Sequence, residues 1–149
     1  MLKYLTYSVV FQEVPDEISL ALEITACPHR CPNCHSPYLR KNVGTELTEE
    51  NIDRLINANP DVSCLCLMGG DSEHQDIIRI ANIVHSYCKK VAVYSGDDEI
   101  DESLIPYLDY YKVGSYQEDL GPLDSKTTNQ VFYKIIDGDL VDITYRFLK

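Results

Sequence analysis

The sequence predicts an α/β fold, a compact incomplete (β/α) barrel of mainly parallel strands with strand hairpins at the N- and C-termini. Three observations lead to this prediction. Predicted strands and helices alternate through the middle of the chain, which is typical of right-handed βαβ units and a parallel sheet. Cysteine- or glycine-containing segments follow several predicted strands. The chain has 149 residues, whereas a closed (β/α)8 barrel usually needs about 250, so the barrel must be incomplete.

Two strands are predicted near the N-terminus. They cover residues 4–11 and 17–25 and are joined by a turn around Pro15 and Asp16. The second strand runs directly into Cys27. This arrangement predicts an antiparallel hairpin followed directly by a cysteine-rich loop.

The central part of the chain alternates between helix and strand. Thr48 is expected to cap a helix that ends near Asn59 and buries Ile52, Leu55 and Ile56. The apolar run from Val62 to Met68 is typical of a strand buried on both faces. A second helix is expected to reach Lys89, with one apolar face formed by Ile77, Ala81, Val84 and Cys88. Cys64, Cys66 and Cys88 are all expected to be core residues.

The remaining elements are short. Strands are predicted over residues 91–94 and 110–113, with a short helix over 103–107 between them. The last two strands, over 131–136 and 140–147, flank Asp137-Gly138, a dipeptide that strongly favours a two-residue hairpin turn.

Composition restricts the possible functions. The length predicts a single domain over residues 1–149. The formal net charge of −11 argues against nucleic acid as a partner, because phosphate binding depends on lysine and arginine. No apolar run has the length of a membrane span, and the first fifteen residues do not resemble a secretory leader. We therefore expect a cytoplasmic protein with no membrane association, whose thiols are reduced.

The cysteine spacing C-x3-C-x2-C is the most informative motif. Cys27, Cys31 and Cys34 lie within eight residues. Thiolates are soft ligands that suit iron–sulfur clusters or zinc. A cluster of four irons normally takes four cysteines, so three cysteines leave one iron without a protein ligand. Such an iron can bind a small molecule.

Other interpretations of the cysteines are open. The three cysteines and His35 could form a Cys3His structural zinc site, although the chain has no second pair of closely spaced ligands. A disulfide framework is less favoured in a chain with no sign of export. A non-catalytic zinc module that binds a protein partner is therefore the alternative from a different functional class.

Several unusual segments follow the ends of predicted strands. These are the cysteine loop, Gly69-Gly70-Asp71, Ser95-Gly96 and Gly114. In α/β sheets and barrels, ligands bind at the edge formed by the carboxyl ends of the strands. We therefore expect these segments to meet at one edge, and an open barrel to leave a lateral gap for a peptide segment of another protein.

Four stretches together resemble a known family. ITACPHRCPNCHSPYL, LMGGDSE, VYSG and GPLDSKTTNQ are similar to the activating proteins of anaerobic ribonucleoside-triphosphate reductases, small radical S-adenosylmethionine (SAM) enzymes. The resemblance covers nearly the whole chain. It implies that Cys27, Cys31 and Cys34 hold a [4Fe–4S] cluster and that SAM binds the remaining iron. It also implies reductive cleavage of SAM to a 5′-deoxyadenosyl radical, which takes a hydrogen atom from a glycine of the reductase.

The resemblance also implies roles for further residues. His35 would lie near the SAM adenine, Gly69, Gly70 and Asp71 would surround the SAM amino group, and Ser95 would be a SAM neighbour. The family commonly has glutamate where this chain has Asp71. No catalytic residue is implied beyond the cluster ligands, because the cofactor supplies the difficult chemistry.

The resemblance implies two partners, the reductase as protein substrate and an electron donor such as flavodoxin. The nearest alternative keeps the chemistry but activates another glycyl-radical enzyme, such as formate C-acetyltransferase. The segment from Gly121 to Gln130 is rich in turn-forming residues, and Val131 follows it where related sequences often have arginine. An ordered loop and a functional segment are both open for this stretch.

Overall fold

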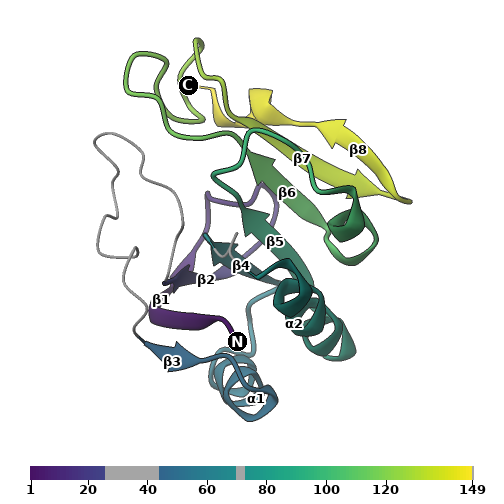
Figure 1. The fold of residues 1–149 in the computed structure, drawn as a ribbon. Coiled ribbons are helices and arrows are strands. Elements are labelled where there is room, and N and C mark those ends of the chain that lie inside the picture. Colours follow the sequence, from purple (N-terminus) through teal and green to yellow (C-terminus); the bar gives the residue numbers. More distant parts are fainter. Residues whose placement is uncertain (26–43, 70–72, 149) are drawn as a thin grey trace.

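The computed structural model describes residues 1–25, 44–69 and 73–148, which form one mixed sheet with helices packed against it (Figure 1). In these residues the sheet has eight strands in the order β3-β1-β2-β4-β5-β6-β7-β8. The strands are β1 (Lys3–Val10), β2 (Ser19–Ile24), β3 (Thr45–Glu46), β4 (Cys64–Met68), β5 (Lys90–Tyr94), β6 (Tyr110–Val113), β7 (Val131–Ile136) and β8 (Asp139–Asp142).

The centre of the sheet is parallel and its flanks are antiparallel. β2, β4, β5 and β6 are parallel neighbours. β1 and β3 add antiparallel pairings on one flank, and β7 and β8 add them on the other. Within the described residues, four of the seven pairings are therefore antiparallel.

The α/β class and both terminal hairpins are confirmed, but the prediction of mainly parallel strands is wrong. The described strands form an open sheet with β3 and β8 at its edges, and not a (β/α) barrel. The physical reason is the cost of each connection. A parallel neighbour needs a crossover of a dozen or more residues, whereas an antiparallel neighbour can be joined by a short turn, as β7 and β8 are by Asp137 and Gly138.

Two α-helices and two 3₁₀ helices are described: α1 (Glu49–Ala58), α2 (His74–Ser86), η2 (Glu102–Tyr107) and η3 (Thr144–Phe147). Thr48 caps α1 as predicted, because its hydroxyl oxygen accepts a hydrogen bond of 3.1 Å from the amide of Asn51. The predicted buried residues of α1 are confirmed: Ile52, Leu55 and Ile56.

The prediction that Cys88 belongs to the apolar face of a helix is wrong. α2 ends at Ser86, and Cys88 has a positive φ of 60° and is exposed. The chain turns sharply at this residue to enter β5, which begins at Lys90. The apolar residues keep their helical spacing as far as Cys88, but the helical backbone itself ends at Ser86.

The final strand is also shorter than predicted. β8 ends at Asp142, and η3 follows it in place of a strand reaching residue 147. The Asp142 carboxylate accepts hydrogen bonds from the backbone amide of Thr144, at 2.9 Å, and from its hydroxyl, at 2.6 Å. This local turn offers the backbone an alternative to strand pairing and so ends the strand.

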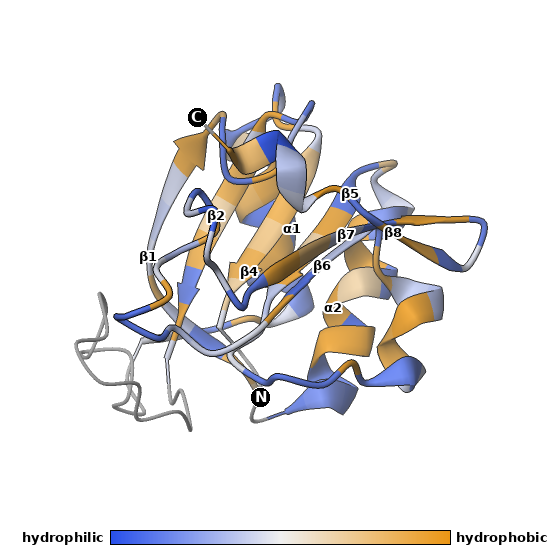
Figure 2. Ribbon diagram, turned by 90° about the horizontal axis from the view of Figure 1, so that it is seen from above, coloured by the Kyte–Doolittle hydropathy of each residue, from blue (hydrophilic) through white to orange (hydrophobic). Residues whose placement is uncertain are grey.

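Each face of the sheet carries its own apolar core. The side chains of α1 and α2 pack on one face, against Leu20, Leu22, Leu65, Leu67, Val91 and Val93. On the opposite face the fully buried Phe132 is central, with its ring centroid 5.8 Å from Tyr94, 6.0 Å from Tyr110 and 4.9 Å from Phe147. Figure 2 shows the apolar character of the central strands between these two layers.

A buried carboxylate joins the amino ends of the parallel strands. Glu17, 7% exposed, accepts hydrogen bonds from Ser63 before β4 (2.7 Å), Lys90 at the start of β5 (2.9 Å) and Tyr110 at the start of β6 (2.8 Å). Burial alone would raise the pKa of Glu17, but these three donors outweigh it and lower the pKa below its usual value. The network therefore stabilises the fold while Glu17 is ionised.

Lys90→Met is expected to lower the free energy of unfolding at neutral pH by about 1–2 kcal/mol, since Glu17 stays buried with one charged donor fewer. A depressed pKa in the folded state stabilises the protein above the unfolded-state pKa, and this stabilisation is lost as the pH falls through the folded-state pKa. Urea unfolding from pH 7 to pH 3 should therefore show the difference from wild type shrinking below pH 4.5, the ordinary pKa of a glutamate side chain.

Lys89→Met is the matched control for Lys90→Met, because it removes the same charge from the neighbouring residue. Lys89 donates only to the backbone oxygen of Pro60 at an exposed position, at 3.0 Å. Equal effects of the two substitutions at every pH would show that the Lys90–Glu17 contact contributes nothing specific.

Within the part of the chain that the structure describes, no helix is long and apolar enough to cross a membrane.

Candidate functional site

The carboxyl ends of β2, β4, β5 and β6 lie at one edge of the sheet. The residues directly after these strands are Thr25, Gly69, Ser95 and Gly114. The parallel pairing places them side by side, because Glu23 of β2 pairs with Met68 of β4, which pairs with Tyr94 of β5. The sequence-based expectation that the ends of these strands meet at one edge is therefore confirmed for the described residues, and we call this edge the rim.

Backbone hydrogen bonds continue across the rim beyond the strands. The Gly69 amide donates to the carbonyl oxygen of Tyr94 at 3.0 Å, and the Ser95 amide donates to that of Lys112 at 2.8 Å. The Gly114 amide then donates to the carbonyl oxygen of Asp97 at 2.7 Å. The loops that leave the rim therefore begin from fixed backbone positions.

Six of the residues assigned to the site by sequence lie outside the described residues: Cys27, Cys31, Cys34, His35, Gly70 and Asp71. The described chain leads into these segments. Thr25 is buried and donates from its backbone amide to the Lys3 carbonyl oxygen at 3.0 Å, two residues before Cys27. Gly69 is the residue directly before Gly70. The origins of both segments are thus at the rim.

Gly69 brings the end of β4 close to the end of β2. Its φ is +103°, a conformation that favours glycine, and a Cβ atom there would lie 3.4 Å from the carbonyl oxygen of Ile24. Ile24 is the last residue of β2. The glycine therefore permits a close approach between the two strand ends from which the cysteine motif and the Gly-Gly-Asp segment depart.

Ser95 is buried at the rim, where its hydroxyl and its carbonyl oxygen both accept hydrogen bonds. Its hydroxyl oxygen accepts a 3.0 Å hydrogen bond from the amide of Asp97, which forms a tight turn after β5. Its carbonyl oxygen accepts from Lys112 at 3.1 Å. These contacts establish a positioning role for Ser95 in the turn.

Lys112 is the residue of the rim that sequence reasoning missed. It is 7% exposed, and its ammonium donates to the carbonyl oxygens of Ser95, at 3.1 Å, and Gly114, at 2.8 Å. The ammonium also lies 6.0 Å from the centroid of the Tyr94 ring. A single lysine among the apolar residues of the predicted strand 110–113 was the signal, because a charge that becomes buried needs specific partners.

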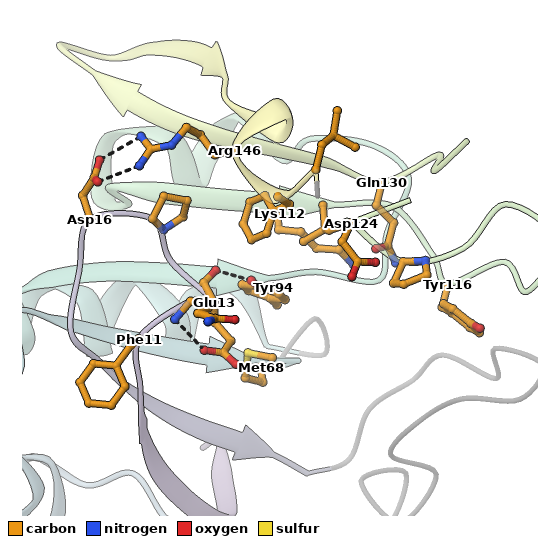
Figure 3. Close-up of a pocket in the computed structure, with 16 residues that line it drawn as sticks. Phe11, Glu13, Asp16, Met68, Tyr94, Lys112, Tyr116, Asp124, Gln130 and Arg146 are labelled. Atoms are coloured by element: carbon orange, nitrogen blue, oxygen red, sulfur yellow. Dashed lines mark hydrogen bonds and ion pairs between the residues drawn. The ribbon is translucent and has the colours of Figure 1, made fainter. Parts of the chain in front are cut away.

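A cavity of about 800 Å³ opens beside the rim on the sheet face opposite α1 and α2 (Figure 3). Met68, Tyr94 and Lys112 line it from the strand ends, and Phe11 and Arg146 line it from the flanks. Its wall mixes aromatic and aliphatic side chains with charged and amide ones, including Lys112 and Arg146.

An ion pair joins the two flanks beside this cavity. Both guanidinium nitrogens of Arg146 donate to the carboxylate of Asp16, at 2.8 and 3.1 Å. The hydrogen bonds from Arg146 lower the pKa of Asp16 below its ordinary value. The hydroxyl of Tyr94 also donates to the carbonyl oxygen of Glu13 (Figure 3). These contacts hold the turn after β1 and the C-terminal segment against the same cavity.

The TTNQ segment is an ordered loop that closes on backbone carbonyl groups. Thr127 and Thr128 donate to the carbonyl oxygens of Leu120, at 2.7 Å, and Gly121, at 3.2 Å. The Asn129 side-chain amide donates to the carbonyl oxygen of Ser115 at 3.0 Å. These bonds support the loop interpretation of this stretch. Val131, which follows this stretch, begins β7 and pairs with Val113.

Cys64 and Cys66, two of the three cysteines outside the motif, are poor metal ligands in this fold. Burial raises the pKa of the Cys64 thiol to about 12 and that of Cys66 well above its ordinary value, so both remain protonated thiols. The prediction that these two are core residues is confirmed. Among the described residues, no group of three or more His, Cys, Asp or Glu side chains is arranged to hold a metal ion.

The donor set of the chain fits an iron–sulfur cluster. Cys27, Cys31 and Cys34 offer three soft ligands in one short segment. That segment leaves the rim between Thr25 and Gly44, the nearest described residues on either side. The burial of Cys64 and Cys66 separates them from this set. The cysteine motif is therefore the part of the chain that would hold the metal.

Comparison with known proteins agrees with this donor set. A family model described as a 4Fe-4S single cluster domain matches residues 18–131, about three quarters of the chain. No curated protein and no solved structure matches the chain. The matched region begins at the start of β2 and ends at the start of β7, so it contains the cysteine motif and the four strands of the rim. The match supports a [4Fe–4S] cluster as cofactor, and the chain belongs to the 4Fe-4S single cluster domain family.

Proposed function

We propose that this protein is a radical SAM activase that generates a glycyl radical on anaerobic ribonucleoside-triphosphate reductase. The observation that carries the proposal is the spacing of Cys27, Cys31 and Cys34 in a member of a 4Fe-4S single cluster family. Three thiolates leave one iron of the cluster available to a small molecule. When bound, the reduced cluster supplies the electron that cleaves SAM, which is chemistry that protein side chains cannot provide.

The rim supports the proposal by gathering the segments that would hold SAM. In this assignment Gly69, Gly70 and Asp71 surround its amino group, and Ser95 shapes the wall beside it. His35, which follows the last cysteine in sequence, is assigned to the adenine. The described strands place Gly69 and Ser95 on the same edge, one residue beyond two adjacent parallel strands.

The cavity beside the rim supports a protein substrate. Its volume of about 800 Å³ exceeds what a buried side chain fills, and its wall of mixed apolar and polar side chains suits a peptide segment. A macromolecular substrate that closes the cavity would exclude water from a reactive radical. We propose the reductase as this substrate and a flavodoxin-type protein as electron donor, in the cytoplasm and without a role for nucleic acid or membrane.

The test is an anaerobic reaction of the cluster-loaded protein with SAM, a reductant and the reductase. We expect slow SAM cleavage alone and productive cleavage when the reductase is added. A doublet EPR signal should then appear on the reductase, and it should collapse when the glycine α-hydrogen is replaced by deuterium. The measured products are 5′-deoxyadenosine and the radical spin count.

Three outcomes would contradict the proposal in different ways. A colourless protein that binds zinc and no iron would favour the zinc module. A doublet on formate C-acetyltransferase, with none on the reductase, would keep the chemistry and change the partner. Fast SAM cleavage with labelling of a small molecule would show that the protein is not an activase.

A further inference from the structure

Lys112 is the only buried lysine or arginine among the residues that the structure describes. The side chains of β6 alternate between the two faces of the sheet: Tyr111 and Val113 belong to the core beneath the helices, and Tyr110 belongs to the opposite core. Lys112 therefore points away from the helices, toward the cavity that it lines (Figure 3). A buried ammonium is costly unless polar groups surround it, so the groups that accept its hydrogen bonds are informative.

The ammonium of Lys112 binds the backbone of the two residues with which the chain leaves β5 and β6. Ser95 directly follows β5, and Gly114 directly follows β6. Their carbonyl oxygens accept from the ammonium at 3.1 and 2.8 Å. The Ser95 amide donates in turn to the Lys112 carbonyl oxygen at 2.8 Å, so both backbone groups of Ser95 are bonded to this one lysine. Hydrogen bonds from a charged donor are roughly twice as strong as those between neutral groups.

Further hydrogen bonds connect these contacts to the neighbouring segments. The Gly114 amide donates to the carbonyl oxygen of Asp97 at 2.7 Å, and the Gly114 carbonyl oxygen also accepts from the side-chain amide of Gln130 at 3.5 Å. The Asp97 amide donates to the hydroxyl of Ser95 at 3.0 Å. We call residues 95–97 the β5 turn. Lys112 thus contributes to a set of hydrogen bonds that joins the β5 turn, the end of β6 and the residue before β7.

We propose that Lys112 is a positioning residue, which fixes the β5 turn for SAM binding by acting through the carbonyl oxygens of Ser95 and Gly114. The inference rests on the proposed function, in which Ser95 shapes the wall beside SAM. Misplacing such a group by about 1 Å can cost about 100-fold, and the short side chain of serine cannot reach across a displaced backbone. The cysteine segment leaves the rim after Thr25, from β2. Loss of the ammonium should therefore weaken SAM binding and leave the cluster in place.

Lys112→Met tests this directly, because methionine keeps an unbranched side chain and removes the ammonium. In the anaerobic, cluster-loaded protein we expect unchanged iron and sulfide content and a SAM affinity that is lower by about 10- to 100-fold. The change in the EPR signal of the reduced cluster on addition of SAM measures this affinity. Backbone hydrogen exchange, followed by mass spectrometry, should become faster over residues 95–98 and 113–116, since the ammonium no longer holds the two carbonyl groups.

Lys90→Met is the matched control. It removes an ammonium from the amino end of β5, where Lys90 binds Glu17, so it lowers stability without touching the rim. Its SAM affinity and its exchange over residues 95–98 should equal those of wild type. Equal losses of SAM affinity in the two variants, or wild-type affinity in Lys112→Met, would overturn the inference alone. A wild type that holds its cluster but binds no SAM would instead overturn the proposed function on which the inference rests.

A rescue experiment with Lys112→Ala separates the hydrogen bonds from the charge, and it provides a second variant should Lys112→Met fail to fold. Alanine leaves a space that opens into the cavity of about 800 Å³. Propylammonium matches the removed atoms and should restore SAM affinity by at least about 10-fold. Tetramethylammonium carries the same charge but has no N–H donor, and it should restore none. Restoration by both ions, or by neither in a folded variant, would overturn the proposal.

Discussion

Replacing Cys31 with serine is expected to remove most of the iron from the protein and to abolish SAM cleavage. Cys31 is one of the three thiolates in the C-x3-C-x2-C motif, and a serine hydroxyl is a hard ligand that remains protonated at neutral pH. The same loss is expected for Cys27→Ser and Cys34→Ser. Iron and sulfide content, together with absorption near 400 nm, measure the outcome after anaerobic purification.

Cys88→Ser is the matched control for the Cys31 substitution. Cys88 is exposed, so serine there causes no packing defect and should leave iron content and SAM cleavage unchanged. Cys64 and Cys66 are less suitable controls, because both are buried and their replacement would disturb the core. Full iron loading of Cys31→Ser would disprove the proposed ligand set. Loss of iron in Cys88→Ser would show that a ligand had been overlooked.

Gly114→Ala is expected to have the largest effect on stability among substitutions at the rim. Gly114 has a φ of +110°, and a Cβ atom there would lie 2.9 Å from the Cα of Gln130 and 3.2 Å from the carbonyl oxygen of Asn129. Both neighbours are backbone atoms and cannot rotate away. Backbone strain and steric overlap each cost about 1–3 kcal/mol, so the free energy of unfolding should fall by about 3–4 kcal/mol.

Comparison with Gly138→Ala separates the steric cost of Gly114→Ala from the cost of backbone strain. Gly138 also has a positive φ, +82°, but a Cβ atom there would have no neighbour within 4 Å. Its substitution should therefore cost about 1 kcal/mol from backbone strain alone. Urea unfolding of both variants gives the comparison. Equal losses would mean that the TTNQ loop moves aside freely, and that its contacts do not fix the rim.

The sequence predicted those elements whose signals are local. The N-cap at Thr48, the apolar strand β4 and the hairpin at Asp137-Gly138 each depend on a few neighbouring residues. Asp137 and Gly138 both have positive φ values, 51° and 82°, as a type I′ turn requires. Such features form in the same way whatever surrounds them, and all three are confirmed.

The sequence was less informative wherever the outcome depends on contacts between distant segments. Alternation of strands and helices cannot show how many pairings are antiparallel, because this depends on which strands become neighbours. The helical spacing around Cys88 continued where the chain turned, and the rim contacts of Lys112 required two carbonyl groups from separate loops. The spacing of the cysteines, in contrast, was sufficient to indicate an iron–sulfur protein before any fold was known.

The Glu17 network has a consequence for how this protein can change. Its donors come from the amino ends of the parallel strands, at the opposite end of the sheet from the rim. In (β/α) barrels the residues at the amino ends of the strands maintain the fold, and the residues at the carboxyl ends perform the chemistry. Loops that leave the rim can therefore accept new sequences while the scaffold stays intact. Laboratory evolution toward another peptide substrate should accordingly succeed most often when libraries vary the carboxyl-end loops and leave Glu17 and its donors unaltered.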